Sequence, residues 1–402
     1  MRILSRRTIS TYDGELKDLI KAWLKPDPQA HDRIMDFRKA FGDFVGVKYA
    51  IATPNGRSAL KAILKGLGLP AGSEVIIPAY EDKSVPDMVL SLGFRPVFTD
   101  IDLKTQNISV EQLKKRITRN TSAVIVAHLF GNPAPMAQLK RMLHERNIRL
   151  IEDCAHAVGT IAEGQPAGSW GDAAFFSFHL TKPFMTFGGG MAVTNDDTLA
   201  QNMEGMYESG TPDQGLLRRM LSAYTLKLLT SKPLFPFTGY PVTLAQEYFG
   251  KGLIETYDRT LRPFTHTADA SFTYIQALAG LGMLRNLPVT IQKRRQLASI
   301  LDMELDPAIP RLAHDKGSNI YFYLIFARDV KKIRHYLLKY GIDTGINVMR
   351  NLPQLFDIKV DFPNTDIAVK RTVQLPLHEY LNEKDIRWIV YVLNKAVKKF
   401  RF

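Results

Sequence analysis

The chain has 402 residues, of which 45% are hydrophobic and 23% are charged, values that are ordinary for a globular protein and exclude a wholly disordered one. Its single cysteine, Cys154, excludes an intrachain disulfide framework and a zinc site built from several cysteines, and fits a reducing cytoplasm. The formal net charge of +13 suits a protein that handles phosphorylated ligands, and because no nucleic-acid-binding motif accompanies it we expect no nucleic-acid partner.

The N-terminal residues 1–20 carry an Arg6-Arg7 pair, but the polar run TYDGELKD follows where an export signal needs an apolar stretch. No window reaches the roughly 18 consecutive apolar residues of a membrane-spanning helix. We therefore predict a cytoplasmic protein, and leave open a peripheral contact with the inner face of the membrane.

Between residues 45 and 193, short apolar runs alternate with amphipathic stretches. Four runs predict buried strands of a largely parallel sheet: residues 74–80, 96–102, 122–130 and 148–156. Helices are expected at 58–68 and 135–147, and two further short strands at 175–179 and 190–196. Strand–helix–strand units of this kind predict a doubly wound α/β domain.

A basic, apolar and proline-containing insert at 215–255 breaks this alternation. Apolar side chains recur at helical spacing over 216–229, at Leu217, Met220, Leu221, Tyr224 and Leu228. Such a helix could lie on a membrane surface. An amphipathic pattern alone does not separate a buried helix from one on a membrane surface. We favour burial at a dimer interface or beneath a loop.

Beyond the insert, a helix is predicted over about 270–302, followed by a smaller α/β unit. Its expected elements are strands at 320–326 and 372–378 and helices at 328–341 and 383–400. We therefore predict a large α/β domain at 1–260, and a connecting helix with a small C-terminal α/β domain at 261–402.

Three clusters lie at the ends of predicted strands, where ligands gather in open α/β sheets. The first is TPNGRSAL at 53–60, in which a glycine permits a tight turn before a helix. Free N–H groups at the helix start, together with Asn55, Gly56 and Arg57, suit a phosphate. A simple capping turn, with Ser58 or Asn55 as the cap, explains the motif equally well.

The second cluster is EDCAH at 152–156, where a carboxylate ends a buried strand and needs a partner. Asp153 could face a protonated pyridine nitrogen. The alternative is that Asp153 caps the next helix, with His156 as its hydrogen-bonded partner.

The third cluster is FSFHLTKPFMTFGGG at 176–190, which places Lys182 in a loop after a strand and Ser177 in reach of a phosphate. An isolated loop lysine is usually a solvated charge. An acid at one strand end, a lysine 29 residues later and an Asn-Gly turn at an earlier helix start are together the parts of a pyridoxal 5′-phosphate (PLP) site.

At these residues the chain resembles the sugar aminotransferases of the DegT/DnrJ/EryC1/StrS family, which have the aspartate-aminotransferase (type I) PLP fold. The resemblance covers nearly the whole chain and is carried by AHLFGNPAPM (127–136), IEDCAHAVGT (151–160), the stretch 168–182, GGMAVTND (189–196) and LPLHEYLNEKDI (375–386). It implies a homodimer with the active site at the subunit interface.

The resemblance also implies a role for each matching residue. Lys182 matches the lysine that holds PLP as a Schiff base, Asp153 the partner of the pyridinium nitrogen, and His156 a residue beside the cofactor ring. Ser177 matches a phosphate ligand, and Gly56–Arg57 match a Gly-Thr pair that binds the phosphate, with arginine in place of threonine.

The chain departs from the family at three positions. Relatives usually stack an aromatic residue on the cofactor where this chain has Asp82, so Tyr80 may substitute for it or the contact is lost. Relatives usually carry an Asn-x-Arg that reaches the partner's site, where this chain has Asp269 and Ser271. We infer that the substrate side is remodelled and the cofactor side intact.

The resemblance implies a PLP-dependent aminotransferase that moves an amino group, with glutamate as the expected donor, onto a keto sugar linked to a nucleotide or a lipid. The pathway would be amino-sugar or cell-surface polysaccharide biosynthesis, and no metal is expected. Lys182 would move the proton and Asp153 would keep the ring protonated. Two alternatives are a PLP-dependent sugar dehydratase, whose relatives carry His at the lysine position, and a non-catalytic PLP-fold binding protein.

Overall fold

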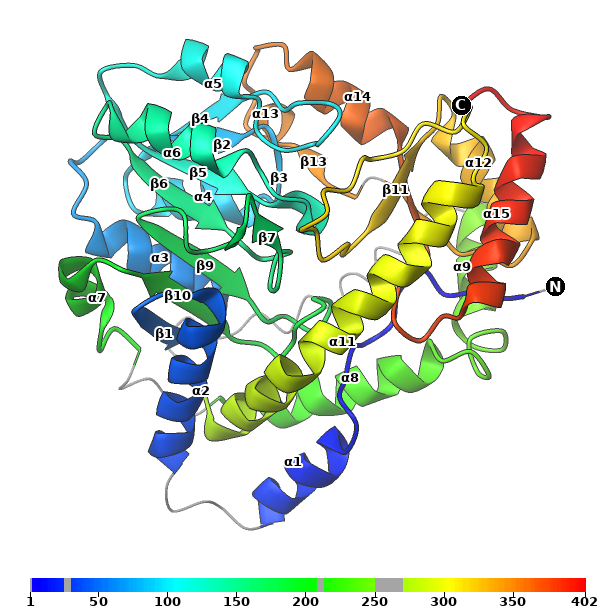
Figure 1. Ribbon diagram of the computed structural model, residues 1–402, viewed down its shortest axis with the longest axis horizontal. Coiled ribbons are helices and arrows are strands. Elements are labelled where there is room, and N and C mark those ends of the chain that lie inside the picture. Colours follow the sequence, from blue (N-terminus) through cyan, green and yellow to red (C-terminus); the bar gives the residue numbers. More distant parts are fainter. Residues whose placement is uncertain (1, 25–29, 208–212, 250–269, 347) are drawn as a thin grey trace.

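A seven-stranded mixed sheet forms the centre of the computed structural model, which describes residues 2–24, 30–207, 213–249, 270–346 and 348–402 (Figure 1). Its strand order is β1-β10-β9-β6-β5-β2-β4. The strands are β1 (Tyr49–Thr53), β2 (Glu74–Pro78), β4 (Arg95–Thr99), β5 (Thr121–Ala127), β6 (Arg149–Asp153), β9 (Ala173–Ser177) and β10 (Gly190–Thr194). Only β10 runs antiparallel to its neighbours, so the prediction of a largely parallel sheet is confirmed.

The four runs predicted as buried parallel strands all end earlier than expected, and the run at 96–102 ends at Thr99. The run at 74–80 leaves the sheet after β2, and β3 (Tyr80–Glu81) pairs instead with β13 (Arg350–Asn351). The run at 122–130 ends at Ala127 and continues as the 3₁₀ turn η1 (Leu129–Gly131), and the run at 148–156 ends at Asp153. The apolar pattern predicted longer strands because side chains remain buried in the turns beyond the strand ends.

Helices cover both faces of the sheet, because successive strand residues point to opposite sides. Ile77 and Ile125 pack against α3 (Gly56–Gly66), α4 (Ser84–Ser91) and α7 (Asp197–Met203). On the other face, Ile76 and Val124 pack against α5 (Val110–Arg116) and α6 (Met136–His144). Further along that face, Val193 packs against α2 (Ala30–Val45) and α11 (Tyr274–Glu304). The doubly wound arrangement is therefore as predicted.

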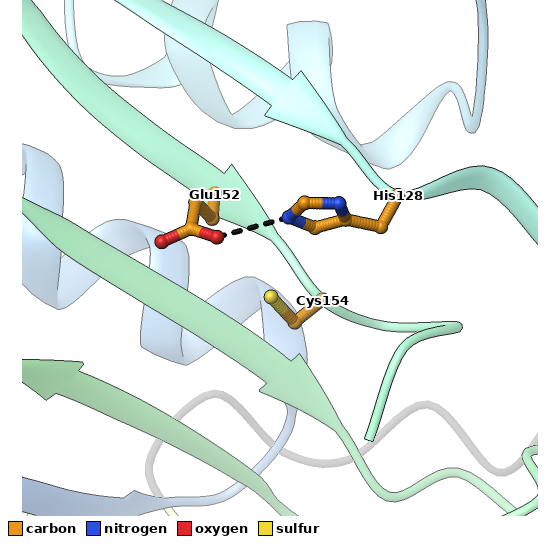
Figure 2. Close-up of side chains that lie close together, drawn as sticks. All are labelled: His128, Glu152 and Cys154. Carbon is orange, nitrogen blue, oxygen red and sulfur yellow. Dashed lines mark hydrogen bonds and ion pairs between the residues drawn. The ribbon is translucent and has the colours of Figure 1, made fainter. Parts of the chain in front are cut away.

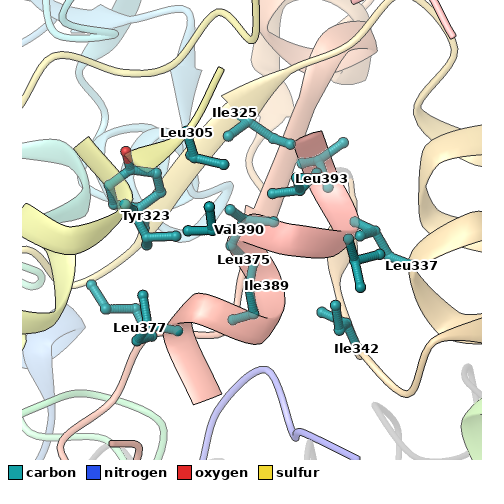
Figure 3. Close-up of a cluster of buried hydrophobic side chains, with 14 of the residues drawn as sticks. Leu305, Tyr323, Ile325, Leu337, Ile342, Leu375, Leu377, Ile389, Val390 and Leu393 are labelled. Atoms are coloured by element: carbon teal, nitrogen blue, oxygen red, sulfur yellow. The ribbon is translucent and has the colours of Figure 1, made fainter. Parts of the chain in front are cut away.

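The C-terminal residues form a second unit around an antiparallel sheet, β11-β14-β12. Leu337, Leu375 and Leu393 are fully buried in its core (Figure 3). Its elements are β11 (Tyr323–Phe326), α12 (Val330–Lys339), β12 (Gly345–Ile346), α13 (Leu352–Leu355), α14 (Pro363–Arg371), β14 (Thr372–Leu375) and α15 (Glu383–Val397). A small hairpin, β7 (Ile161–Ala162) with β8 (Gln165–Pro166), completes the strands of the described residues.

The division into domains 1–260 and 261–402 stays a proposal, since its boundary lies outside the described residues. Two residues on the N-terminal side of that boundary pack on the C-terminal unit. Leu4 belongs to its core, and the Tyr240 hydroxyl donates a hydrogen bond to the Leu338 carbonyl at 2.5 Å.

The insert forms α8 (Leu216–Leu229) and α9 (Gly239–Phe249), and α8 lies beside α1 (Glu15–Leu24) (Figure 1). The helix at 216–229 is as predicted, and what covers its apolar face stays a prediction. Met220 faces the interior, whereas Leu217, Leu221 and Leu228 are exposed. The buried face of α8 includes Arg219, whose side chain bonds inside the protein rather than facing solvent. No helix among the described residues combines the length and apolarity needed to cross a membrane.

The packing of the C-terminal unit gives a stability prediction. Leu337→Ala should lower the free energy of unfolding by about 2–5 kcal/mol, because the lost side chain leaves a cavity in a fully buried site. Met303→Ala, at a side chain that is 74% exposed, should change it by less than about 0.5 kcal/mol. Urea unfolding followed by circular dichroism measures both, and equal effects would contradict the packing described above.

Candidate active site

A cavity of about 640 Å³ lies at the sheet edge where the parallel strands β5, β6 and β9 end. Ligands of open α/β sheets bind at this edge. The cavity brings together seven residues that the sequence singled out, from three separate segments: Asn55, Gly56, Arg57, Asp153, His156, Ser177 and Lys182.

The N-terminus of α3 forms one wall of the cavity. The Asn55 side chain accepts a hydrogen bond from the Ser58 N–H at 3.0 Å, so the capping interpretation of this motif is confirmed. The cap leaves the N–H groups of Gly56 and Arg57 without carbonyl partners inside the helix. Capping and anion binding are therefore compatible here, because the cap orients the helix end that faces the cavity.

Two glycines allow this helix end to pack directly on the sheet. A Cβ on Gly56 would lie 2.8 Å from the Cβ of Ser177, and a Cβ on Gly190 would lie 2.5 Å from the carbonyl carbon of Asn55. Both distances are shorter than a carbon–carbon contact. The hydroxyl-bearing Ser177 is thereby held beside the free N–H groups of α3.

Asp153 ends β6 and is 6% exposed. Its Oδ1 accepts a hydrogen bond from the Ala155 N–H at 2.8 Å, and burial raises the pKa of this carboxyl to about 6. The described residues directly after Asp153 form turns and not a helix, so the helix-capping alternative is wrong. A buried carboxyl with a raised pKa gains most from a cationic partner that enters the cavity.

Lys182 lies in the loop between β9 and β10, where its backbone N–H bonds to the His179 carbonyl at 2.9 Å. Burial lowers the pKa of its amine, while the carboxyls of Asp153, Asp82 and Glu81 act in the opposite direction. A lowered pKa increases the fraction of free amine near neutral pH, which is the form that attacks a carbonyl.

His156 stands beside Lys182 with its ring against Tyr321, at 4.8 Å between centroids. Its Nδ1 accepts a long hydrogen bond of 3.4 Å from the Phe130 N–H. Burial and the charge of Lys182 hold the pKa of His156 well below its usual range, so the ring is neutral. With Nδ1 as acceptor, the proton lies on Nε2, which is then available as a donor.

Two adjacent carboxyls at the cavity wall have pKa values shifted in opposite directions. Burial raises the pKa of Asp82, but hydrogen bonds from Ser84 and the charges of Lys182 and Arg350 outweigh it and hold that pKa below its usual range. Burial, followed by the charge of Asp153, raises the pKa of Glu81 well above its usual range. Asp82 therefore loses its proton more readily than Glu81.

Three other predicted residues lie elsewhere. Tyr80 is fully buried with its ring against Phe130, 6.3 Å between centroids, and does not line the cavity, so it is no substitute for the stacking aromatic. Ser271 is half-buried before α11 and also does not line the cavity. Asp269 lies outside the described residues.

Sequence reasoning missed the cationic side of the cavity. Arg7, Lys83 and Arg350 line it, and they come from the N-terminal segment, from the start of α4 and from β13. No local pattern marks Arg7 or Arg350, because each reaches the cavity through contacts between distant parts of the chain. The pairing of β13 with β3 is one such contact.

His128, Glu152 and Cys154 form a buried cluster (Figure 2), and His128 also lines the cavity. The Glu152 carboxylate accepts hydrogen bonds from the N–H groups of Gly168, Trp170 and Gly171, each at 2.8 Å, and from His128 Nε2 at 2.9 Å. His128 Nδ1 accepts from the Ala134 N–H at 3.1 Å, which fixes the proton on Nε2.

The same cluster has the spacing of a metal site, but its ligand atoms are already used within the protein. Glu152 instead ties the loop before β9 to the end of β6. The Cys154 thiol beside it is fully buried, and burial raises its pKa well above the usual range. We therefore read this cluster as structural.

The sequence matches the DegT/DnrJ/EryC1/StrS aminotransferase family over residues 16–231 and 251–394, and the chain belongs to that family. It is 41% identical to the GDP-perosamine synthase of Caulobacter vibrioides over 170 residues, which are 42% of this chain and 46% of that relative. It is 27% identical to the spore coat polysaccharide biosynthesis protein SpsC of Bacillus subtilis over 401 residues, 94% of this chain and 92% of SpsC.

Among solved structures, the PLP form of Spr1654 from Streptococcus pneumoniae matches with a TM-score of 0.77 and 20% identity, over 99% of each chain. At this identity the match shows the fold alone, which is the predicted PLP-dependent type. The protein is thus a PLP-dependent sugar aminotransferase. Its cavity fits PLP, because it offers free helix N–H groups, a buried carboxyl and a lysine amine.

The opposite pKa shifts of Glu81 and Asp82 give a prediction for the protein freed of PLP. Asp82→Asn should lower the pKa of the Lys182 amine further, because it removes a negative charge, and each unit raises the free-amine fraction about tenfold. Lys182 should then react several-fold faster with trinitrobenzenesulfonate at neutral pH. Competitive labelling with peptide mass mapping measures this rate.

The matched control is Glu81→Gln, which replaces a carboxyl with a raised pKa by an amide of the same shape. It should accelerate the labelling of Lys182 less than Asp82→Asn does, because a carboxyl with a raised pKa is less often ionised than one with a lowered pKa. Equal acceleration by both substitutions would contradict the opposite pKa shifts of the two carboxyls.

Proposed function

We propose that this enzyme transfers the amino group of glutamate to the carbonyl carbon of a keto sugar, with Lys182 as the residue that holds PLP and moves the proton. The observation that carries the proposal is the meeting of Lys182, Asp153 and the N-terminus of α3 in one cavity. Bound PLP supplies a ring that accepts the electron pair left when a substrate carbon loses its proton.

The side chains divide the work by position. The Lys182 amine, once free, would take the proton from the substrate carbon and pass it to the cofactor, since its lowered pKa suits a base near neutral pH. The Asp153 carboxylate would keep the ring nitrogen protonated. The Nε2 proton of His156 would be available to the ring substituents, and Ser177 and the N–H groups of Gly56–Arg57 would hold the phosphate.

Glutamate is supported as the donor by the cationic wall of the cavity. Arg7 and Arg350 both line it and come from different parts of the chain. Guanidinium groups bind carboxylates with two parallel hydrogen bonds, and a dicarboxylic donor presents two such groups.

A nucleotide-linked keto sugar is supported as the acceptor by the names of two relatives. One is a GDP-perosamine synthase and the other is a protein of spore coat polysaccharide biosynthesis. A lipid-linked keto sugar is the second candidate, favoured by the leucines exposed on α8 beside the cofactor loop. Sugar dehydration is disfavoured, since Lys182 stands where such enzymes are expected to carry His.

The glutamate half-reaction tests this proposal. Wild-type enzyme mixed with glutamate should lose the absorbance of lysine-bound PLP, gain that of pyridoxamine phosphate and release 2-oxoglutarate. Lys182→Ala should lack the first absorbance band and lose turnover by at least about a thousandfold, because it removes both the attachment point and the base. Full activity of that variant would refute the role of Lys182, and no reaction of wild type with glutamate would refute the donor.

We also propose a cytoplasmic homodimer, in which the partner subunit completes the substrate side of the cavity. Multi-angle light scattering should give a mass of twice the 45.4 kDa of the chain. The physical reason is that Asp82 stands in the cavity wall where relatives are expected to carry an aromatic residue, so one chain alone lacks that contact. A monomer that retains full turnover would rule out a shared site.

A further inference from the structure

A stripe of exposed leucines follows one side of α8. Leu217, Leu221 and Leu228 are 46%, 61% and 58% exposed. Their spacing of four and seven residues places them on one face of the helix. Large apolar side chains gathered in this way on a surface mark an interaction site.

A second stripe follows α1, whose inner face is anchored by Leu19. Leu16, Ile20 and Trp23 are 50%, 50% and 48% exposed, and Leu24 is 73% exposed. Each lies within about half a turn of the next around the helix. The helix therefore presents a broad apolar face that the described residues do not cover.

The two stripes border the same side of the α1–α8 pair. The Tyr224 hydroxyl of α8 donates to Glu15 of α1 at 2.9 Å, and Leu19 packs against α8. Asp18, on the opposite side of α1, interacts with Tyr12, which lies against α11 at Gly282. Glu15 and Leu19 form the side of α1 that faces α8, so the stripe lies on the exposed side of α1. The two helices lie next to each other (Figure 1), and we call their exposed apolar sides together the α1–α8 face.

Basic residues accompany the α1–α8 face. Lys17 and Lys21 are exposed on α1, Arg218 is exposed on α8, and Lys227 of α8 is half-buried. An isologous contact between two copies through this face would bring like charges together. An anionic surface complements it, as basic residues around an apolar helix face do in membrane-surface helices.

We propose that the α1–α8 face binds the surface of an anionic membrane, with α1 and α8 lying in the plane of the head groups. This goes beyond the amino transfer and does not depend on it. The contact would also bring the active site to the membrane, because the Arg219 side chain of α8 bonds to the Phe187 carbonyl in the loop that carries Lys182. The hydroxyls of Thr230, at the end of α8, and of Thr8 are hydrogen-bonded at 2.8 Å, and Thr8 is next in sequence to the cavity residue Arg7.

Vesicle co-sedimentation of the full-length, PLP-loaded enzyme tests the proposal. Vesicles of phosphatidylcholine mixed with phosphatidylglycerol should bind the protein, with binding weakened by salt, and pure phosphatidylcholine vesicles should bind it less. Leu221→Glu with Leu228→Glu should lower the partition coefficient at least about tenfold, since it places two charges in the apolar stripe. Circular dichroism and the absorbance of bound PLP confirm that the variant is folded.

The matched control is Val289→Glu with Met303→Glu, which makes the same charge change on α11 at side chains that are 65% and 74% exposed. It should keep the partition coefficient within about twofold of wild type, apart from the general effect of charge. No binding of wild type to either vesicle, or an equal loss in both variants, would overturn the proposal. A change in oligomeric mass confined to the first variant, with vesicle binding unchanged, would also overturn it and assign the face to a second copy.

Discussion

The burial of opposite charges at one sheet edge is the constraint on which this active site depends. Asp153 and Lys182 are buried together, and burial raises the pKa of Asp153 and lowers that of Lys182, which in each case favours the neutral form. Neither would be stable there alone, because an unpaired buried charge costs several kcal/mol. The parallel strands supply the geometry, since β6 and β9 end side by side. The cofactor, with a phosphate, a ring nitrogen and an aldehyde, meets each of the groups that this edge leaves unsatisfied.

The close backbone contacts around the cavity leave little room for larger side chains at this edge of the sheet. Asn55 and Gly56 lie against Gly190 at distances that leave no room for a side chain. Glu152, next to Asp153 in sequence, points to the other side of β6 and uses its carboxylate to hold the loop before β9. Two neighbouring acids thus serve different ends, one structural and one facing the ligand, because alternate residues of a strand face opposite ways.

Much of this could be predicted from the sequence, for physical reasons that also set the limit. Apolar alternation identified the sheet and its helices, and the positions of Gly56, Asp153 and Lys182 at element ends identified the cavity. Strand ends were overestimated, because His128 and Phe130 stay buried after the ladder stops. The sequence located α8 but not the partner of its apolar face, since a leucine stripe indicates an apolar surface and not what covers it. Arg7 and Arg350 reach the cavity only through tertiary contacts.

The burial of Cys154 has a practical consequence for spectroscopy. Its thiol is fully enclosed and is held in the unreactive protonated form, so alkylating reagents should pass it by. Because it is the only cysteine in the chain, a cysteine introduced at an exposed position would be the only reactive thiol. A fluorophore or spin label could then be attached at a chosen place without first replacing the native cysteine. Distances between such labels would report how the two helices of the α1–α8 face move when ligands bind.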